Sequence, residues 1–136
     1  MKVAVRYYTR SGNTKKLAEA VAEAVAAEAL EVAVPLAEKV DILFLGCSYY
    51  AFDVDEAVKA FIVANKEHIG KIVCIGTSAM MKSMKKPVSK VADGAGVRVA
   101  EEEFHCRGKF GIFHKNRPNE DDLARVKEFA KKIVSE

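Results

Sequence analysis

The 136-residue sequence has no tryptophan, no long apolar run and few cysteines. Its three cysteines contain no C-x-x-C pair, and an odd number in this arrangement does not supply a disulfide framework. Glu, Lys or Asp interrupts every apolar run before the roughly 18 residues that a membrane span needs. The N-terminus lacks the apolar segment and cleavage site of a signal peptide. We therefore expect a cytoplasmic protein with one domain over residues 1–136 and no membrane partner.

Five segments have the pattern of β-strands. Three are continuously apolar, as expected of strands buried on both faces: residues 3–5, 42–45 and 72–75. Two mostly alternate between apolar and polar residues, which is typical of edge strands: residues 30–36 and 97–101. Cys47 and Cys74 accompany the apolar runs, where a small buried thiol is the ordinary interpretation.

Helical patterns lie between the strands: over residues 14–29, after Asp53, near 80–92 with an interruption at Pro87, and after Asn119. Strands that alternate with helices indicate a parallel sheet covered on both faces. The sequence therefore predicts an α/β fold, a three-layer doubly wound sheet of five parallel strands in the order 2-1-3-4-5.

Ligands of such a sheet bind beyond the carboxyl ends of its strands, where the strand order reverses. The first loop at that edge is Tyr8-Thr9-Arg10-Ser11-Gly12-Asn13-Thr14, which combines hydroxyl groups, a glycine and a following helix N-terminus. Backbone N–H groups at a helix start bind anions, so the loop predicts a phosphate site. The alternative is that Ser11 or Asn13 only caps the helix and Gly12 only turns the chain.

Two further loops would meet at the same edge. Gly46 to Asp53 contains three aromatic residues, Tyr49, Tyr50 and Phe52, and one of them would stack on a flat heteroaromatic ligand. Gly76 to Met81 offers small polar groups and backbone for the edge of a ring, through Thr77, Ser78, Ala79 and Met80. Together with a phosphate site, these loops describe a pocket for flavin mononucleotide (FMN).

Competing phosphate sites are excluded by missing motifs. The sequence contains neither G-x-x-x-x-G-K-[ST] nor G-x-G-x-x-G, so a P-loop and a Rossmann dinucleotide site are not supported. No acidic pair follows the first strand, as a response-regulator receiver requires, and the first loop has no cysteine to act as the nucleophile of a thiol phosphatase.

The sequence resembles the short-chain flavodoxins along nearly its whole length. Residues 9–14 look like that family's T/S-x-T/S-G-N-T phosphate loop, and residues 45–48 and 71–77 look like the third-strand exit and the fourth strand. The resemblance implies a flavodoxin-like fold and a one-electron carrier with non-covalent FMN. It places Thr9, Ser11, Gly12, Asn13 and Thr14 at the phosphate, with Arg10 in the same cofactor-binding loop. One side of the flavin ring would be held by Ser48, Tyr49, Tyr50, Ala51 and Phe52, and the other side and its pyrimidine edge by Thr77, Ser78, Ala79 and Met80. No catalytic residue and no metal ligand is implied.

The chain departs from the flavodoxin pattern in its charge and at a few positions. Flavodoxins are usually acidic, whereas this chain has a net charge of +3, and residues 80–117 carry nine Lys or Arg against four Asp or Glu. We expect this region to dock redox partner proteins with acidic faces. Ala51 stands where the family often has glycine, Ala79 and Met80 where an aromatic ring often stacks, and Arg6 lies inside a strand that is usually apolar.

Two other functions stay open from the sequence. One is a flavodoxin-like FMN-dependent oxidoreductase of the quinone reductase, flavin reductase or protoporphyrinogen oxidase type, although no acid–base group declares itself among His68, His105 and His114. The other is a flavodoxin-fold binding module without flavin. We expect a monomer and no nucleic-acid partner, because no recognition motif accompanies the basic region.

Overall fold

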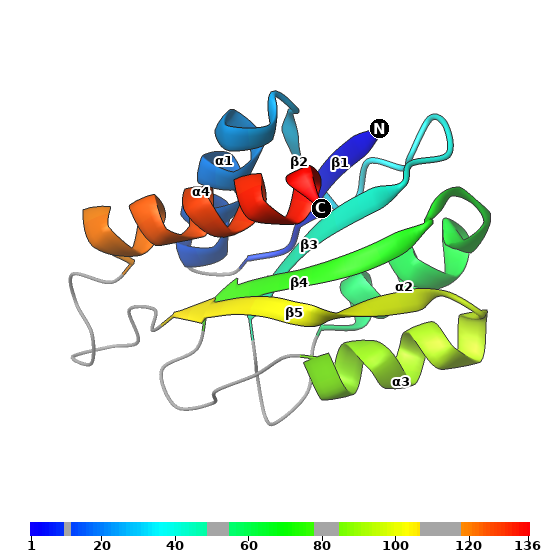
Figure 1. Ribbon diagram of the computed structural model, residues 1–136. Coiled ribbons are helices and arrows are strands. Elements are labelled where there is room, and N and C mark those ends of the chain that lie inside the picture. Colours follow the sequence, from blue (N-terminus) through cyan, green and yellow to red (C-terminus); the bar gives the residue numbers. More distant parts are fainter. Residues whose placement is uncertain (10–11, 49–54, 78–84, 107–117) are drawn as a thin grey trace.

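The fold is an α/β sandwich built on one five-stranded sheet (Figure 1). The computed structural model describes residues 1–9, 12–48, 55–77, 85–106 and 118–136. Within them all strand pairs are parallel and the strand order is β2-β1-β3-β4-β5, as predicted. The strands are β1 (Val3–Tyr7), β2 (Ala29–Glu31), β3 (Ile42–Ser48), β4 (Lys71–Thr77) and β5 (Arg98–Cys106).

Helices cover both faces of the sheet. They are α1 (Asn13–Val25), α2 (Glu56–Ala64), the 3-10 helix η1 (Lys66–His68), α3 (Lys85–Ala95) and α4 (Glu120–Ser135). α1 and α4 contact each other over one face, and α2 and α3 contact each other over the opposite face (Figure 1). The three layers expected from the sequence are therefore confirmed. No described helix is both long enough and apolar enough to cross a membrane.

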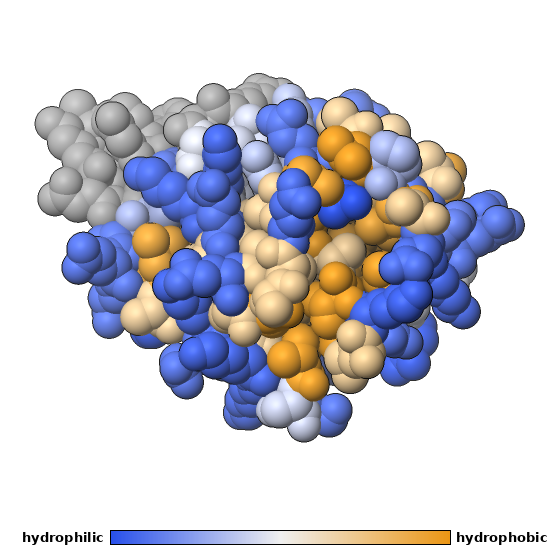
Figure 2. All heavy atoms as spheres, turned by 90° about the horizontal axis from the view of Figure 1, so that it is seen from above, coloured by the Kyte–Doolittle hydropathy of each residue, from blue (hydrophilic) through white to orange (hydrophobic). Residues whose placement is uncertain are grey.

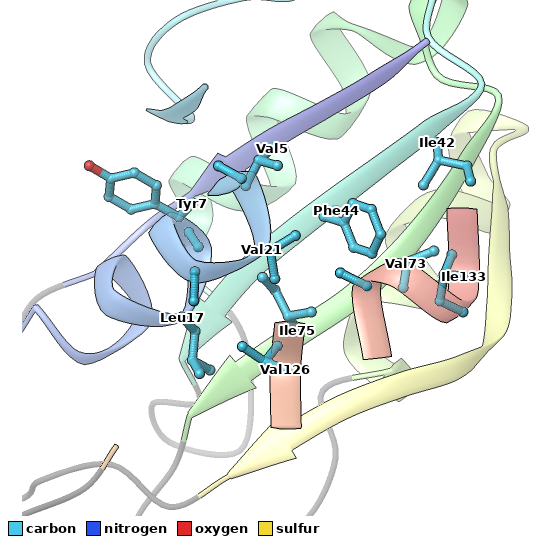
Figure 3. Packing of buried hydrophobic residues seen from close by; sticks show 14 of the residues in the cluster. Val5, Tyr7, Leu17, Val21, Ile42, Phe44, Val73, Ile75, Val126 and Ile133 are labelled. Carbon is cyan, nitrogen blue, oxygen red and sulfur yellow. The ribbon is translucent and has the colours of Figure 1, made fainter. Parts of the chain in front are cut away.

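The core consists of two apolar clusters, one on each face of the sheet. Under α1 and α4, Phe44 and Val73 from the central strands meet Val21 and Val126 from the helices (Figure 3). The other cluster lies under α2 and α3 and includes Leu45. Such complete burial of strand residues on both faces explains the continuous apolar runs of the sequence.

Two helices start at side-chain caps that fix their positions. Asn119 and Asp122 form a reciprocal capping box at the start of α4, each side chain accepting from the other residue's backbone N–H at 2.9 Å. At α2 the cap is Asp55, whose Oδ1 accepts from the N–H of Ala57 at 3.0 Å, so the helix starts two residues later than Asp53 would place it.

The second strand is much shorter than predicted. β2 ends at Glu31, and the ten residues before β3 form no helix. Near its start the N–H of Val32 donates to the Tyr7 carbonyl of β1 at 2.9 Å, and near its end Val40 forms an isolated bridge with Ile69. Arg6, which is 7% exposed in the middle of β1, holds this connection in place. Its guanidinium donates to the carbonyls of Val34 at 2.9 Å and Pro35 at 3.2 Å. Arg6, although it interrupts an apolar strand, thus stabilises the connection between β2 and β3, which contains no helix.

Candidate functional site at the carboxyl edge of the sheet

The carboxyl ends of β1 and β3 form the point at which the chain changes direction across the sheet. From β1 the chain passes through α1 to β2 on one side, and from β3 it passes through α2 to β4 on the other. Tyr7 is paired with Gly46, and the N–H of Tyr8 donates to the Gly46 carbonyl at 3.0 Å, so the two strands stay together to their ends. Doubly wound sheets bind ligands at such a reversal.

A tight turn leads from this point into α1. Gly12 has a φ of +87°, a left-handed conformation that glycine adopts without steric cost. Its N–H donates to Thr9 Oγ1 at 2.9 Å, and its carbonyl accepts from the N–H of Lys16 at 3.3 Å as the first turn of the helix closes. Gly12 therefore turns the chain into α1, a geometry that fits both a phosphate site and the alternative in which the glycine only turns the chain.

The start of α1 is suited to an external anion. Its N-cap is glycine, which has no side chain to satisfy the first-turn N–H groups, and no acidic residue lies in that turn. Lys15 and Lys16 are exposed there and add positive charge. By contrast, α4 has its capping box and three acidic residues in its first turn. The positive end of the α1 dipole is thus left uncompensated by its own first turn.

Gly46 brings α1 close to β3. A Cβ on Gly46 would lie 2.9 Å from Thr14 Cγ2 and 3.3 Å from Tyr7 Cβ, closer than packed side chains tolerate. Thr14 is fully buried at this contact, and its neighbour Asn13 is also buried, with 7% of its surface exposed. The sequence predicted both as phosphate ligands, but it gave no indication that Gly46 sets the height of the helix start above the sheet.

The structure brings together four residues predicted for the first loop: Thr9, Gly12, Asn13 and Thr14. It also pairs the backbones of Ser48 and Thr77, which end the adjacent strands β3 and β4 at the same edge. The predicted residues that lie outside the described part of the chain are Arg10, Ser11, Tyr49, Tyr50, Ala51, Phe52, Ser78, Ala79 and Met80.

The cysteines of the sheet are buried thiols, as the sequence suggested, and form no disulfide. Burial raises the pKa of the Cys74 thiol to about 12, and it raises the pKa of Cys47 well above the ordinary value. Both thiols are therefore protonated and unreactive at neutral pH. No cluster of potential metal ligands occurs among the described residues.

His105 is closer to this edge than its sequence position suggests. The pairing of β4 with β5 places it beside Gly76, one residue before Thr77. It is half-buried and lies next to the last residue of β5. Sequence separation alone hid this proximity, because the register of an edge strand is not readable from spacing.

Comparison with known proteins shows one fold shared across several functions. No family model matches the sequence. An uncharacterized protein of Methanocaldococcus jannaschii is 29% identical over 136 aligned residues, covering 90% of both chains. An archaeal flavodoxin is 17% identical, with a TM-score of 0.77 over 99% of this chain and 97% of its own.

Two further structures extend the comparison. A Lactobacillus acidophilus flavoprotein in complex with FMN has a TM-score of 0.62 at 19% identity, covering 78% of this chain and 92% of its own. The rubredoxin oxygen:oxidoreductase of Desulfovibrio gigas has a TM-score of 0.74 at 14% identity, matching 98% of this chain but 35% of its own. At these identities the likeness establishes the fold of this chain.

Proposed function

We propose, on the premise that this chain has the flavodoxin fold, that it binds FMN and carries single electrons between redox enzymes. The observation that carries the proposal is the start of α1, where the N-cap is Gly12 and the first turn holds no acidic residue, at the strand-order reversal. The fold likeness to flavodoxins, and to a flavoprotein that binds FMN, supports the same cofactor.

The residues at the carboxyl edge suit the parts of FMN. The first-turn N–H groups of α1, with Lys15 and Lys16 nearby, would hold the phosphate. The loops that follow Ser48 and Thr77 begin side by side and would hold the flavin ring between them. When bound, FMN supplies reversible one-electron chemistry, and the chain contributes position, electrostatics and access.

The basic region supports acidic redox partners. Lys85, Lys86 and Lys90 lie on α3, which follows the β4 loop, and Arg98 starts β5. The other cations of residues 80–117 lie outside the described residues: Lys82, Arg107, Lys109, Lys115 and Arg117. Lys85 is already held at 2.7 Å by the Glu101 carboxylate, so Lys86 and Lys90 are the freer charges. We expect electron transfer to an acidic partner to slow with added salt, because such steering is screened over about 8 Å at physiological ionic strength.

The cofactor is tested by comparing FMN with riboflavin. Charge-assisted hydrogen bonds contribute roughly 1.5–3 kcal/mol each, so two of them at the phosphate predict about 10²- to 10⁴-fold tighter binding of FMN. Lys15→Ala with Lys16→Ala should weaken FMN and leave riboflavin unchanged, whereas Lys131→Ala on α4 should change neither. Equal dissociation constants for the two flavins, measured by fluorescence titration, would refute a phosphate site in this turn.

An enzyme with its own substrate is the second candidate, and the position of His105 beside Gly76 favours it. Imidazole is the commonest acid–base group, and this one lies next to the start of the third loop. The two functions are distinguished by steady-state turnover of NAD(P)H with quinone or free flavin by the FMN-loaded protein. Turnover that His105→Gln abolishes while FMN affinity is retained would indicate the enzyme, and absence of turnover would indicate the carrier.

A further inference from the structure

One position in the helix layer of this fold is not filled by a helix. Crossovers between parallel strands are right-handed, so the connection from β2 to β3 must pass over β1 on the face that carries α2 and α3. The other crossovers of the sheet contain α1, α2 and α3, but this one contains only ten irregular residues. The sheet surface over β1 and β2 is consequently covered less deeply than its other parts.

A cavity of about 510 Å³ opens at this position. One wall is α2, through Ala57, Ala60 and Ala64, and the other is the connection, through Val32, Ala33 and Pro35. Most of its lining is apolar, and the α2 residues that face it are mainly small. We call this cavity and its two walls the α2 groove.

Exposed apolar side chains continue the α2 groove onto the surface. Three large hydrophobic residues are exposed in the described chain, namely Met1, Val34 and Val63. Val34 lies on the connection between two groove residues at 41% exposure, and Val63 lies on α2 beside Ala64 at 54% exposure. Viewed over the β2 edge of the sheet, apolar atoms gather between hydrophilic rims (Figure 2). Contiguous exposed apolar surface of this kind marks an interaction site.

We propose that the α2 groove is the interface of a weak two-fold dimer, in which the α2 helix of each copy covers the groove of the other. An interface between identical copies must be self-complementary, with projecting and receding groups on the same patch. The groove meets this condition, because Val63 projects from the outer face of α2 while Ala60 and Ala64 leave room beside it. The helix that fills the unfilled layer position is then the partner copy's α2.

The charges at the ends of the α2 groove match this arrangement. Glu31 lies at the carboxyl end of the sheet, where β2 is paired with Tyr7 of β1. Lys66 lies at the opposite end, in the turn that follows α2. In this dimer the two-fold axis is perpendicular to α2, so the two α2 helices are antiparallel and Lys66 of each copy lies toward Glu31 of the other. Both side chains belong to exposed residues, so opposite charges meet at a solvated rim.

The dimer is tested by sedimentation equilibrium of the whole chain up to about 1 mM, a range that covers weak association. We expect concentration-dependent dimerisation that Ala60→Glu weakens at least tenfold, because it places an unpaired carboxylate in the apolar groove. Ala124→Glu is the matched control, since Ala124 is an exposed alanine on α4. A wild type that stays monomeric throughout this range overturns the proposal, as does Ala60→Glu that associates like the wild type.

Charge exchange separates this arrangement from any other self-association. Glu31→Lys alone and Lys66→Glu alone should each weaken the dimer, and the double exchange should restore it. Single variants that weaken association without restoration in the double variant would refute the antiparallel pairing. The monomer expected from the sequence is the dissociated form in this equilibrium, and neither measurement depends on FMN.

Discussion

Replacing Arg6 with methionine tests how the unusual connection between β2 and β3 is held. Arg6 donates three hydrogen bonds, to the carbonyls of Val34, Pro35 and Val5, at distances of 2.9, 3.2 and 3.0 Å. Methionine has a similar length and fits a buried position, so the substitution removes the donors while it keeps most of the packing.

The size of the effect depends on the carbonyl groups that lose their donor when Arg6 is replaced. Replacing a buried ion pair by apolar residues is often harmless because both partners leave together. Here the acceptors are backbone carbonyls, which no side-chain substitution removes. Each hydrogen bond to a charged donor contributes roughly 1.5–3 kcal/mol, but burying the guanidinium offsets part of this sum. Burial also lowers the pKa of Arg6, in line with that desolvation cost. We therefore expect Arg6→Met to lower the free energy of unfolding by about 2–4 kcal/mol.

The measurement is urea unfolding followed by circular dichroism, with thermal unfolding beside it. A loss of that size corresponds to a decrease in Tm of about 6–16 °C for a chain of this length. Arg98→Met is the control, because Arg98 is an exposed residue at the start of β5, where a change within about 0.5 kcal/mol is expected. If Arg6→Met unfolds within about 0.5 kcal/mol of the wild type, the three hydrogen bonds do not hold the connection.

Two other substitutions test local packing and the buried thiols. Gly46→Ala should lower the free energy of unfolding by about 1–3 kcal/mol and weaken FMN binding, because the new methyl group would crowd Thr14. Gly94→Ala in α3 is the control and should be neutral or stabilising, because a Cβ there meets no atom within 4 Å. Equal unfolding midpoints for the two variants would contradict the close approach of α1 to β3. The Cys74 thiol has a pKa of about 12 in the folded state and near 9.0 in the unfolded state. Its contribution to the free energy of unfolding is therefore complete below pH 9 and falls by about 1.4 kcal/mol per pH unit above it. Cys74→Ala should reduce this alkaline slope in urea unfolding between pH 9 and 11, and an unchanged slope would refute the assignment.

The sequence predicted the sheet because its signals are local and strong. Continuous apolar runs identify central strands, and their alternation with helical patterns leaves few topologies. The second strand was predicted too long, since residues 30–36 alternate as a strand does. In the structure Val32 and Leu36 turn into the core from an irregular connection, and the N–H of Leu36 donates to Asn65 of the turn after α2 rather than to a neighbouring strand.

Helix ends were predicted less well because their signals were absent or ambiguous. The first helix was expected to reach residue 29 but ends at Val25, where Ala26 adopts a left-handed φ of +56° without the glycine that usually marks such an end. The helix predicted near 80–92 is described over Lys85–Ala95, and Pro87 sits in its first turn, where its missing N–H has no intrahelical partner to lose.

The candidate site also has features that the sequence predicted and features that it did not. The turn at Gly12 was predictable, because hydroxyl groups, glycine and a helix start have a known consequence for the backbone. The roles of Gly46 and Arg6 were not predictable, because each depends on residues distant in sequence. Gly46 packs against Thr14, and Arg6 donates to the carbonyls of Val34 and Pro35. A glycine or an arginine inside an apolar strand signals a constraint, but only the fold names its partner.

The connection between β2 and β3 also forms one wall of the α2 groove. The stability that Arg6 gives to this connection should therefore affect the free energy of dimerisation. Arg6 fixes the carbonyls of Val34 and Pro35 within a single copy, whereas Ala60 contributes only to the opposite wall. At concentrations where the chain is monomeric, Ala60→Glu should therefore leave the free energy of unfolding unchanged within about 0.5 kcal/mol, while Arg6→Met should lower it. At high concentration both variants should dimerise less than the wild type. Ala60→Glu places a charge in the groove, whereas Arg6→Met frees the connection, which the second copy then has to order again on binding. Sedimentation and unfolding of the two variants, compared at low and high concentration, test this asymmetry. An Arg6→Met protein that is less stable yet dimerises like the wild type would show that the connection wall takes no part in the interface.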